Sequence, residues 1–270
     1  MKISKKLYKN IFFIVLIFSA AFTSGCNFGK RYTKIESKEV NINSNNKSKL
    51  ILENINGNIK IIKSSDSNKV NLKYTLETKV KKKDLDKPIS DLKVSIETTT
   101  GEIKISGEHV KRKGIFFGGK AKRRIDFELY VPENLVLEID NMNGNVSVTE
   151  INNNLRLELV NGEVLLERTN GLVECSLVNG NIRGKIDSTN GMKIDLINGD
   201  IVLFLKQSVQ GFVRAEVKNG RVEYENLKFE NEKKEKRSLN GRLGQSGNSI
   251  LVDVVNGKIK FIGTEELAEK

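Results

Sequence analysis

Short apolar runs alternate with Asn-Gly dipeptides along most of this 270-residue chain. In LVECSLVNGNIRGKIDSTNG, from Leu172 to Gly191, apolar and polar residues alternate on both sides of Asn179-Gly180. Both residues of the dipeptide tolerate positive φ, so Asn-Gly is a strong indication of a tight turn. Alternation with a period of two is typical of strands that bury one face. The pattern predicts an all-β protein built from many short strands.

The same unit recurs along the chain, and equivalent positions repeat the same chemistry. Aligned on the turn, eight units place their glycines at Gly57, Gly101, Gly144, Gly162, Gly180, Gly199, Gly220 and Gly257. The spacings from Gly144 to Gly220 are 18, 18, 19 and 21 residues, which indicates a repeat of about twenty residues with two strands. Two residues after each glycine stands a β-branched residue, a type that packs well on a half-buried pleated surface: Ile59, Ile103, Val146, Val164, Ile182, Ile201, Val222 and Ile259.

Two architectures fit this repeat. In a β-solenoid each unit is one coil, like residues stack on one another, and the asparagines form a ladder along one corner. In an antiparallel hairpin meander or sandwich each Asn-Gly is a type I′ turn, and general alternation suffices. The matching chemistry of equivalent positions favours a β-solenoid over residues 33–263, followed by a C-terminal tail at residues 264–270.

Positions before the turn predict which side chains face inward and outward. Four residues before the turn asparagine the compact units place small or apolar residues, which we expect to be buried: Leu157, Cys175, Ile194, Ala215 and Val252. Three residues before the turn stands an outward column with seven acids: Glu53, Glu97, Asp140, Glu158, Ser176, Asp195, Glu216 and Asp253. Carboxylates raise a calcium hypothesis. Basic neighbours on the same face favour a solvated ladder of mixed charge instead, and we expect no metal: Arg156, Lys193 and Arg214.

The first residues resemble a bacterial export signal. Four lysines precede an apolar run of twelve residues, Ile11 to Phe22, and Thr-Ser-Gly leads to Cys26. A bilayer span needs about 20 apolar residues, so the run is too short to cross. The placement of Cys26 resembles a lipobox, although Thr23 stands where that pattern prefers Leu. We therefore predict a lipoprotein signal peptide at 1–25 and a lipidated, palmitate-bearing tether at 26–32; an ordinary cleaved secretory signal is the alternative.

A longer run, DFELYVPENLVLEIDNMNGNVSVTEINNNLRLELVNGEVLLERTNG, resembles the bacterial family of "putative adhesin" or toast-rack domains, which includes LiaG-like envelope-stress proteins and GIN-like lipoproteins. The resemblance covers nearly the whole chain from Thr33 to Gly263. It implies a β-helical protein without catalytic activity at the cell envelope or surface. The family offers no catalytic residues that could be carried over to this sequence.

Side-chain chemistry agrees with a protein that is not an enzyme. The single histidine, His109, cannot build a histidine-based triad or a multi-histidine metal site. Cys175 is expected to be a small buried residue, and no cofactor motif appears. A polysaccharide lyase remains a weaker alternative, because an outward cluster of acids beside a base could cleave acidic sugars.

Positive charge is concentrated in three segments that interrupt the repeat, near residues 80–90, 111–124 and 228–248. The whole chain carries a net charge of +12. In the middle segment two basic clusters flank Gly114 to Gly119, which suits contact with an anionic surface: rings enter the interface and cations meet phosphates. The candidate binding residues are Lys111, Arg112, Lys113, Phe116, Phe117, Lys120, Lys122, Arg123 and Arg124. A solvated loop whose Phe residues fold back on the domain is the alternative.

Together these features predict a lipid-anchored, extracytoplasmic binding protein on the cell membrane, in contact with anionic phospholipid or a phosphate-rich envelope polymer. The resemblance adds a role in envelope stress. A surface adhesin or assembly subunit, with a protein partner, is the main alternative. No nucleic-acid-binding motif is present and an exported protein rarely meets nucleic acid, so we expect no such partner.

Overall fold

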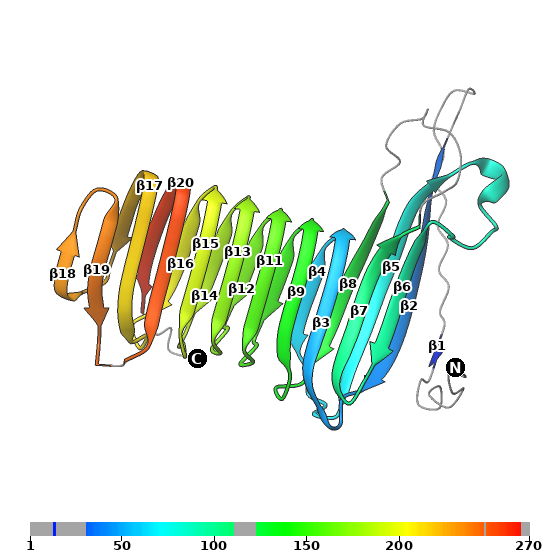
Figure 1. The fold of residues 1–270 in the computed structure, drawn as a ribbon, viewed down its shortest axis with the longest axis horizontal. Coiled ribbons are helices and arrows are strands. Elements are labelled where there is room, and N and C mark those ends of the chain that lie inside the picture. The colour runs from blue at the N-terminus through cyan, green and yellow to red at the C-terminus, as the bar shows by residue number, and fades with distance from the viewer. Residues whose placement is uncertain (1–12, 15–30, 111–122, 246, 266–270) are drawn as a thin grey trace, which may run out of the picture.

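Most strands stack in parallel and in register, so that the chain forms a long rack of coils (Figure 1). The computed structural model describes residues 13–14, 31–110, 123–245 and 247–265. Two layers of strands face each other, and each coil contributes one strand to each layer. The long strands β17 (Gly211–Glu225) and β20 (Ser249–Thr264) run through both layers.

In the first layer, the neighbours from one end to the other are β6 (Leu92–Thr98), β7 (Gly101–His109), β3 (Lys47–Asn56), β9 (Val136–Asn143), β11 (Leu155–Asn161), β13 (Val173–Asn179), β15 (Met192–Asn198), the first halves of β20 and β17, β19 (Ser238–Leu243) and β18 (Glu230–Lys234). All pairs from β7 to β17 are parallel. The pairs β6–β7, β17–β19 and β18–β19 are antiparallel.

In the second layer, the order is β1 (Phe13–Ile14), β2 (Tyr32–Asn43), β5 (Lys69–Val80), β8 (Arg124–Val131), β4 (Ile59–Lys63), β10 (Val146–Thr149), β12 (Val164–Glu167), β14 (Ile182–Ile186), β16 (Ile201–Lys206) and the second halves of β20 and β17. The pairs from β8 to β17 are parallel, whereas β1, β2, β5 and β8 pair antiparallel with one another. A short 3-10 helix, η1 (Lys82–Asp84), follows β5.

The core lies between the layers and is made of the predicted inward columns. Leu157, Cys175 and Ile194 are in register on β11, β13 and β15, and each is at most 1% exposed. Seven of the eight predicted β-branched residues form one column in the second layer, also at most 1% exposed: Ile59, Val146, Val164, Ile182, Ile201, Ile259 and Val222. Burial of these stacked side chains is the main source of stability, at about 25 cal/mol per Å² of apolar surface.

The corner between the layers carries the predicted asparagine ladder. In each step the Nδ2 of one turn asparagine donates to the Oδ1 of the asparagine in the next coil, over 2.8 to 3.0 Å. The ladder runs in spatial order through Asn56, Asn143, Asn161, Asn179, Asn198, Asn256 and Asn219. Parallel strands and this ladder confirm the β-solenoid and exclude a hairpin meander for these units.

One of the eight aligned units was assigned wrongly. Gly101 begins β7, directly after the hairpin turn that joins β6 to it, so Ile103 pairs with Leu50 in the first layer and lies outside the β-branched column. Phe127 occupies the place beside Ile59. Likewise, Glu97 pairs with Lys104 in β6–β7, and the neighbour of Glu53 is Ser106. A Gly turn followed by a β-branched residue looks alike in a hairpin and in a coil, so the local pattern could not separate them.

The order of coils departs from the order of the chain at the far end. β20 lies between the β15–β16 coil and β17, pairing in parallel with each. The β18–β19 hairpin, formed by the segment expected as a basic insertion at 228–248, then continues the first layer beyond β17. The edge strand β18 reads ENEKK and is exposed throughout. Charged side chains on an edge strand prevent pairing with other chains.

Candidate functional site

The predicted anionic-surface residues lie mostly outside the described residues. This holds for Lys111, Arg112, Lys113, Phe116, Phe117, Lys120 and Lys122, and for the predicted lipidation site, Cys26. Arg123 and Arg124 are described, at the start of β8.

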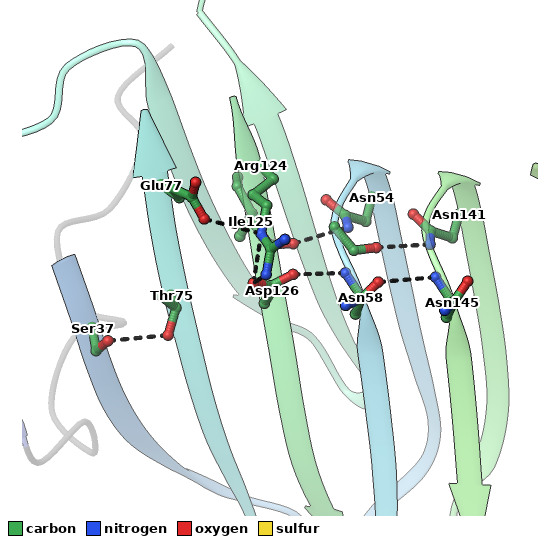
Figure 2. Close-up of polar contacts among 11 residues, drawn as sticks. Ser37, Asn54, Asn58, Thr75, Glu77, Arg124, Ile125, Asp126, Asn141 and Asn145 are labelled. Carbon is green, nitrogen blue, oxygen red and sulfur yellow. Dashed lines mark hydrogen bonds and ion pairs between the residues drawn. The ribbon is translucent and has the colours of Figure 1, made fainter. Parts of the chain in front are cut away.

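Arg124 is held by carboxylates at the root of that segment (Figure 2). Its guanidinium lies 3.3 Å from Glu77 and 2.5 Å from Asp126. Asp126 in turn accepts a hydrogen bond of 2.7 Å from the backbone N–H of Asn58, and the side chain of Asn58 accepts one of 3.0 Å from the backbone of Asn145. Asp126 and Asn58 thus begin a ladder along the corner, in which each side chain accepts a hydrogen bond from a backbone N–H of the next coil. Arg124 holds the first member of this ladder and therefore has a structural role.

The structure brings the start of β2, the loop at 81–91 and the described flanks of residues 111–122 to one end of the rack. Tyr32, at the start of β2, is opposite Val80, where β5 ends and the loop at 81–91 begins. Leu92, where that loop ends, is opposite His109, the last residue of β7. Arg124 is opposite Glu77, three residues before Val80. The start of the β2 strand, the loop and both flanks of residues 111–122 are therefore neighbours.

The loop at 81–91 packs against β2 instead of extending freely. The buried Lys34 ammonium donates a hydrogen bond of 2.6 Å to the carbonyl of Leu85 and lies 3.4 Å from Glu36. Glu36 also accepts a bond of 2.9 Å from the backbone of Ile89. These contacts fix the loop across the end of the two layers.

The anchored loop presents exposed cations to solvent. We define the basic corner as the exposed residues Arg31, Lys81, Lys82, Lys83 and Lys87. Two acids accompany them, Asp84 and Asp86. A hydrogen bond from Lys87 at 2.8 Å, followed by the charges of Lys87, Lys83 and Lys81, lowers the pKa of Asp84 below its ordinary value. Five bases against these two acids give +3, and the buried Asp91 at the end of the loop reduces the net charge to +2.

A second surface lies on the outer side of the first layer. A groove of about 1370 Å³ runs along the rack from β6 and β7 to β17 and the start of β19. Its acidic column contains the predicted outward residues in register across seven coils: Glu53, Asp140, Glu158, Ser176, Asp195, Asp253 and Glu216. Its apolar column stands two positions later on six of these seven strands: Ile55, Met142, Val160, Val178, Ile197 and Val255. On β17 the equivalent residue is Lys218. We call this surface the axial groove.

The apolar column was missed from the sequence. Its signal was present, because an apolar residue directly precedes the turn asparagine in most units. Strict alternation places that residue on the outer face, where an apolar side chain contributes nothing to the core. Five of the ten exposed large apolar side chains among the described residues belong to this column.

Ion pairs neutralise part of the acidic column, as the mixed-charge interpretation predicted. Arg214 pairs with Glu216 at 2.7 Å, Lys193 with Asp195 at 3.5 Å, and Arg156 with Glu158. Asp140 and Asp253 form no such pair among the described residues, and no group of three ligands suited to a metal ion is present there.

Burial and neighbouring carboxylates act together on these two acids. Partial burial, followed by the charges of Glu158 and Glu53, raises the pKa of Asp140. Partial burial, followed by the charges of Glu216 and Asp195, raises the pKa of Asp253. Both carboxylates therefore lie where a cation is favourable.

The axial groove and the basic corner contain neither cysteine nor histidine, the side chains that most often react near neutral pH. Cys175 is buried in the core, and burial raises the pKa of its thiol to about 12. Burial, together with the charge of Arg123, lowers the pKa of His109. Over the stretches that the structure describes, no helix is long and apolar enough to cross a bilayer.

Comparison with known proteins gives a family and several similar folds. The family model described as Toastrack DUF4097 matches residues 22–261. A "putative cell adhesion protein" from Clostridium sporogenes is similar at 15% identity and a TM-score of 0.47, with 87% of this chain and 100% of that chain covered. A "putative adhesin" from Bacteroides fragilis is similar at 14% identity and a TM-score of 0.34, with 84% and 97% covered. No curated protein matches the chain.

Proposed function

Because this chain belongs to the Toastrack DUF4097 family, we propose that its rack of coils is a rigid binding scaffold without catalytic activity. Lipid on Cys26 holds the scaffold at the extracytoplasmic face of the cell membrane. The basic corner and the basic segment beside it contact phosphate-bearing envelope components. The observation that carries the proposal is that the start of β2, the loop at 81–91 and both flanks of residues 111–122 meet at one end of the rack.

The anchor and the basic corner are close along the chain. From Cys26 to Tyr32 there are six residue steps, which span at most about 22 Å when fully extended. A lipid on Cys26 therefore keeps the basic corner near the headgroups. Each basic residue near an anionic membrane contributes about 1 kcal/mol, so the five cations of the corner add a substantial attraction.

Residues 111–122 are joined to the same end by β7 and β8. Their sequence, KRKGIFFGGKAK, offers cations for phosphate and two Phe rings for the interface. The fixed ion pairs of Arg124 with Glu77 and Asp126 hold the root of this segment, and we assign Arg124 no contact with the surface.

Vesicle binding tests the proposal. The chain from residue 27 onward is mixed with phosphatidylglycerol vesicles or phosphatidylcholine vesicles and sedimented. We expect binding to the anionic vesicles, and replacement of Lys81, Lys82 and Lys83 by Gln weakens it about a hundredfold. Binding also falls as salt rises, because exposed charges are screened within about 8 Å at physiological ionic strength.

A matched variant separates the corner from net charge. Lys228, Lys233 and Lys236 are exposed at the opposite end of the rack, and their replacement by Gln removes the same charge. Equal loss in both variants contradicts an oriented contact. Neutralising the basic residues of the adjacent segment, with Arg124 left in place, extends the test to Lys111, Arg112, Lys113, Lys120 and Lys122.

Two further measurements address the ligand and the anchor. Soluble polyphosphate that releases the protein from vesicles identifies phosphate as the group recognised; failure to compete points to the bilayer itself. Labelling of cells with a fatty-acid analogue marks the wild-type chain and leaves Cys26→Ser unlabelled. Equal labelling of both chains contradicts the anchor.

A further inference from the structure

The axial groove combines two features that call for a partner. Its apolar column contains Met142, Ile197 and Val160, with 49%, 45% and 40% of their surfaces exposed. Contiguous exposed apolar patches in a protein surface mark sites of interaction. The apolar column runs parallel to the acidic column, separated from it by two strand residues, which is about 6.7 Å.

The groove carries charge opposite to that of the chain. Nine acidic and three basic side chains line it, a net charge of −6. Arg156, Lys193 and Arg214, just outside the lining, pair with three of these acids and reduce the net charge to −3, whereas the whole chain has a net charge of +12. Asp140 and Asp253 lie in this lining without an ion pair among the described residues. A partner with an apolar stripe beside a row of cations complements both columns.

The length of the groove and the spacing of its coils favour an α-helix over an extended strand as the partner. Neighbouring coils are about 4.8 Å apart, so seven coils extend for about 29 Å. An α-helix of 20 residues is about 30 Å long and repeats every 5.4 Å, close to the spacing of the coils. An extended strand repeats the same face every 6.7 Å or so, and its side chains fall out of step with the columns.

We propose that the axial groove binds a basic amphipathic α-helix of a protein or peptide partner, whose apolar stripe lies on the column from Ile55 to Val255 and whose lysines or arginines face the acidic column. This is the helix-in-groove mode of recognition. A second copy of the groove carries the same negative charge and does not fit it. The groove lies apart from the basic corner, so this proposal goes beyond the proposed function and does not depend on it.

A synthetic helix tests the groove. The probe is a twenty-residue peptide of Leu and Lys, with Leu at positions i, i+3, i+4 and i+7 of each repeat so that one face is apolar. Its control has the same composition in an order without an apolar face. Titration calorimetry at about 0.15 M salt is expected to show saturable binding of one probe per chain, and much weaker binding of the control.

Two pairs of substitutions separate the columns. Met142→Ser with Val160→Ser removes part of the apolar column, and Asp140→Asn with Asp253→Asn removes the unpaired charges. Each pair is expected to weaken probe binding about tenfold. The matched pair Leu165→Ser with Glu163→Gln changes exposed residues of β12 and its turn, outside the groove lining, and leaves binding within about twofold of the wild type.

The outcomes are distinguishable. Absence of probe binding, equal binding of the control peptide, or groove variants that bind like the wild type overturns the proposal. Self-association of the wild type that the groove variants abolish makes a second copy the occupant and also overturns it. All four groove positions are exposed on the outer face, so we expect every variant to fold, and circular dichroism checks this. The Lys81, Lys82 and Lys83 variant keeps its affinity for the probe, so failure here is separate from failure of the membrane proposal.

Discussion

Gly180 lies directly against the carbonyl oxygen of Gly162 in the next coil: a β-carbon at position 180 comes 1.6 Å from that oxygen. The φ of Gly180 is +144°, a conformation that other residues rarely adopt. The corner therefore depends on glycine both for its backbone conformation and for the close approach of neighbouring coils.

Gly180→Ala is expected to destabilise the rack by at least about 3 kcal/mol, because the coils must separate at the corner and the backbone is strained. For a domain of this size that lowers the melting temperature by about 6 to 12 °C, measurable by calorimetry. Gly247→Ala is the control, since a β-carbon there meets nothing within 4 Å. Similar melting temperatures for the two variants contradict the tight corner.

Ile182→Asp tests the β-branched column. Ile182 is fully buried between Val164 and Ile201, so an unpaired carboxylate there is expected to cost about 4 kcal/mol or more. Arg183→Asp places the same carboxylate on the outer face of the same strand and is expected to melt near the wild type. A larger loss in Arg183→Asp means that the faces are inverted.

The thiol of Cys175 is expected to be inert in the folded protein. Burial raises its pKa to about 12, so almost no thiolate forms near neutral pH, and the core excludes the reagent. In the chain from residue 27, which has no other cysteine, a chromogenic disulfide reagent is expected to react only after denaturation. Cys175→Ala gives no reaction in either state. Rapid reaction of the native protein indicates that this part of the rack opens.

Asp140→Asn is expected to stabilise the protein at neutral pH. The raised pKa of Asp140 means that its ionisation costs stability in the folded state. The gain shrinks as the pH falls through the folded-state pKa and is lost below the unfolded value of about 3.9, where the carboxyl is protonated in both states. Melting curves from acidic to neutral pH measure it. Glu158→Gln, which loses the ion pair with Arg156, gains nothing; a gain that persists in acid contradicts the assignment.

The repeated columns could be predicted from the sequence because stacking demands like residues at equivalent positions. Leu157, Cys175 and Ile194 illustrate this, since each lies directly above the next. Coils that lack the Asn-Gly turn but still occupy a place in the stack could not be predicted. Asp126 takes the capping place that Asn58 holds in the next coil, although the sequence around it has no Asn-Gly turn. Only the pairing of β8 with β4 reveals that equivalence.

Of the two columns of the axial groove, only the acidic column could be predicted from the sequence. The acids before each turn form a recognisable column in the sequence, whereas Met142 and Val160 each precede a turn asparagine without any local sign that they form a second column. Their significance comes from the distance between the two columns and from the ends of the groove. At one end the groove is lined by the β6–β7 hairpin, which the repeat alignment treated as an ordinary coil, and at the other by Arg237 and Ser238, which lie outside the repeat.

The position of β20 sets the order in which the rack can be completed. Synthesis produces β17 first, but its parallel neighbour is β20, which follows later in the chain and also pairs with β15 and β16. Until β20 pairs with its neighbours, β15 and β16 have unpaired backbone N–H and C=O groups along one edge of each layer. The β18–β19 hairpin, which pairs with β17, is not yet joined to the rest of the rack. β20, the last of the described strands along the chain, therefore fills the gap between the β15–β16 coil and β17, so that another chain cannot pair with the edges there.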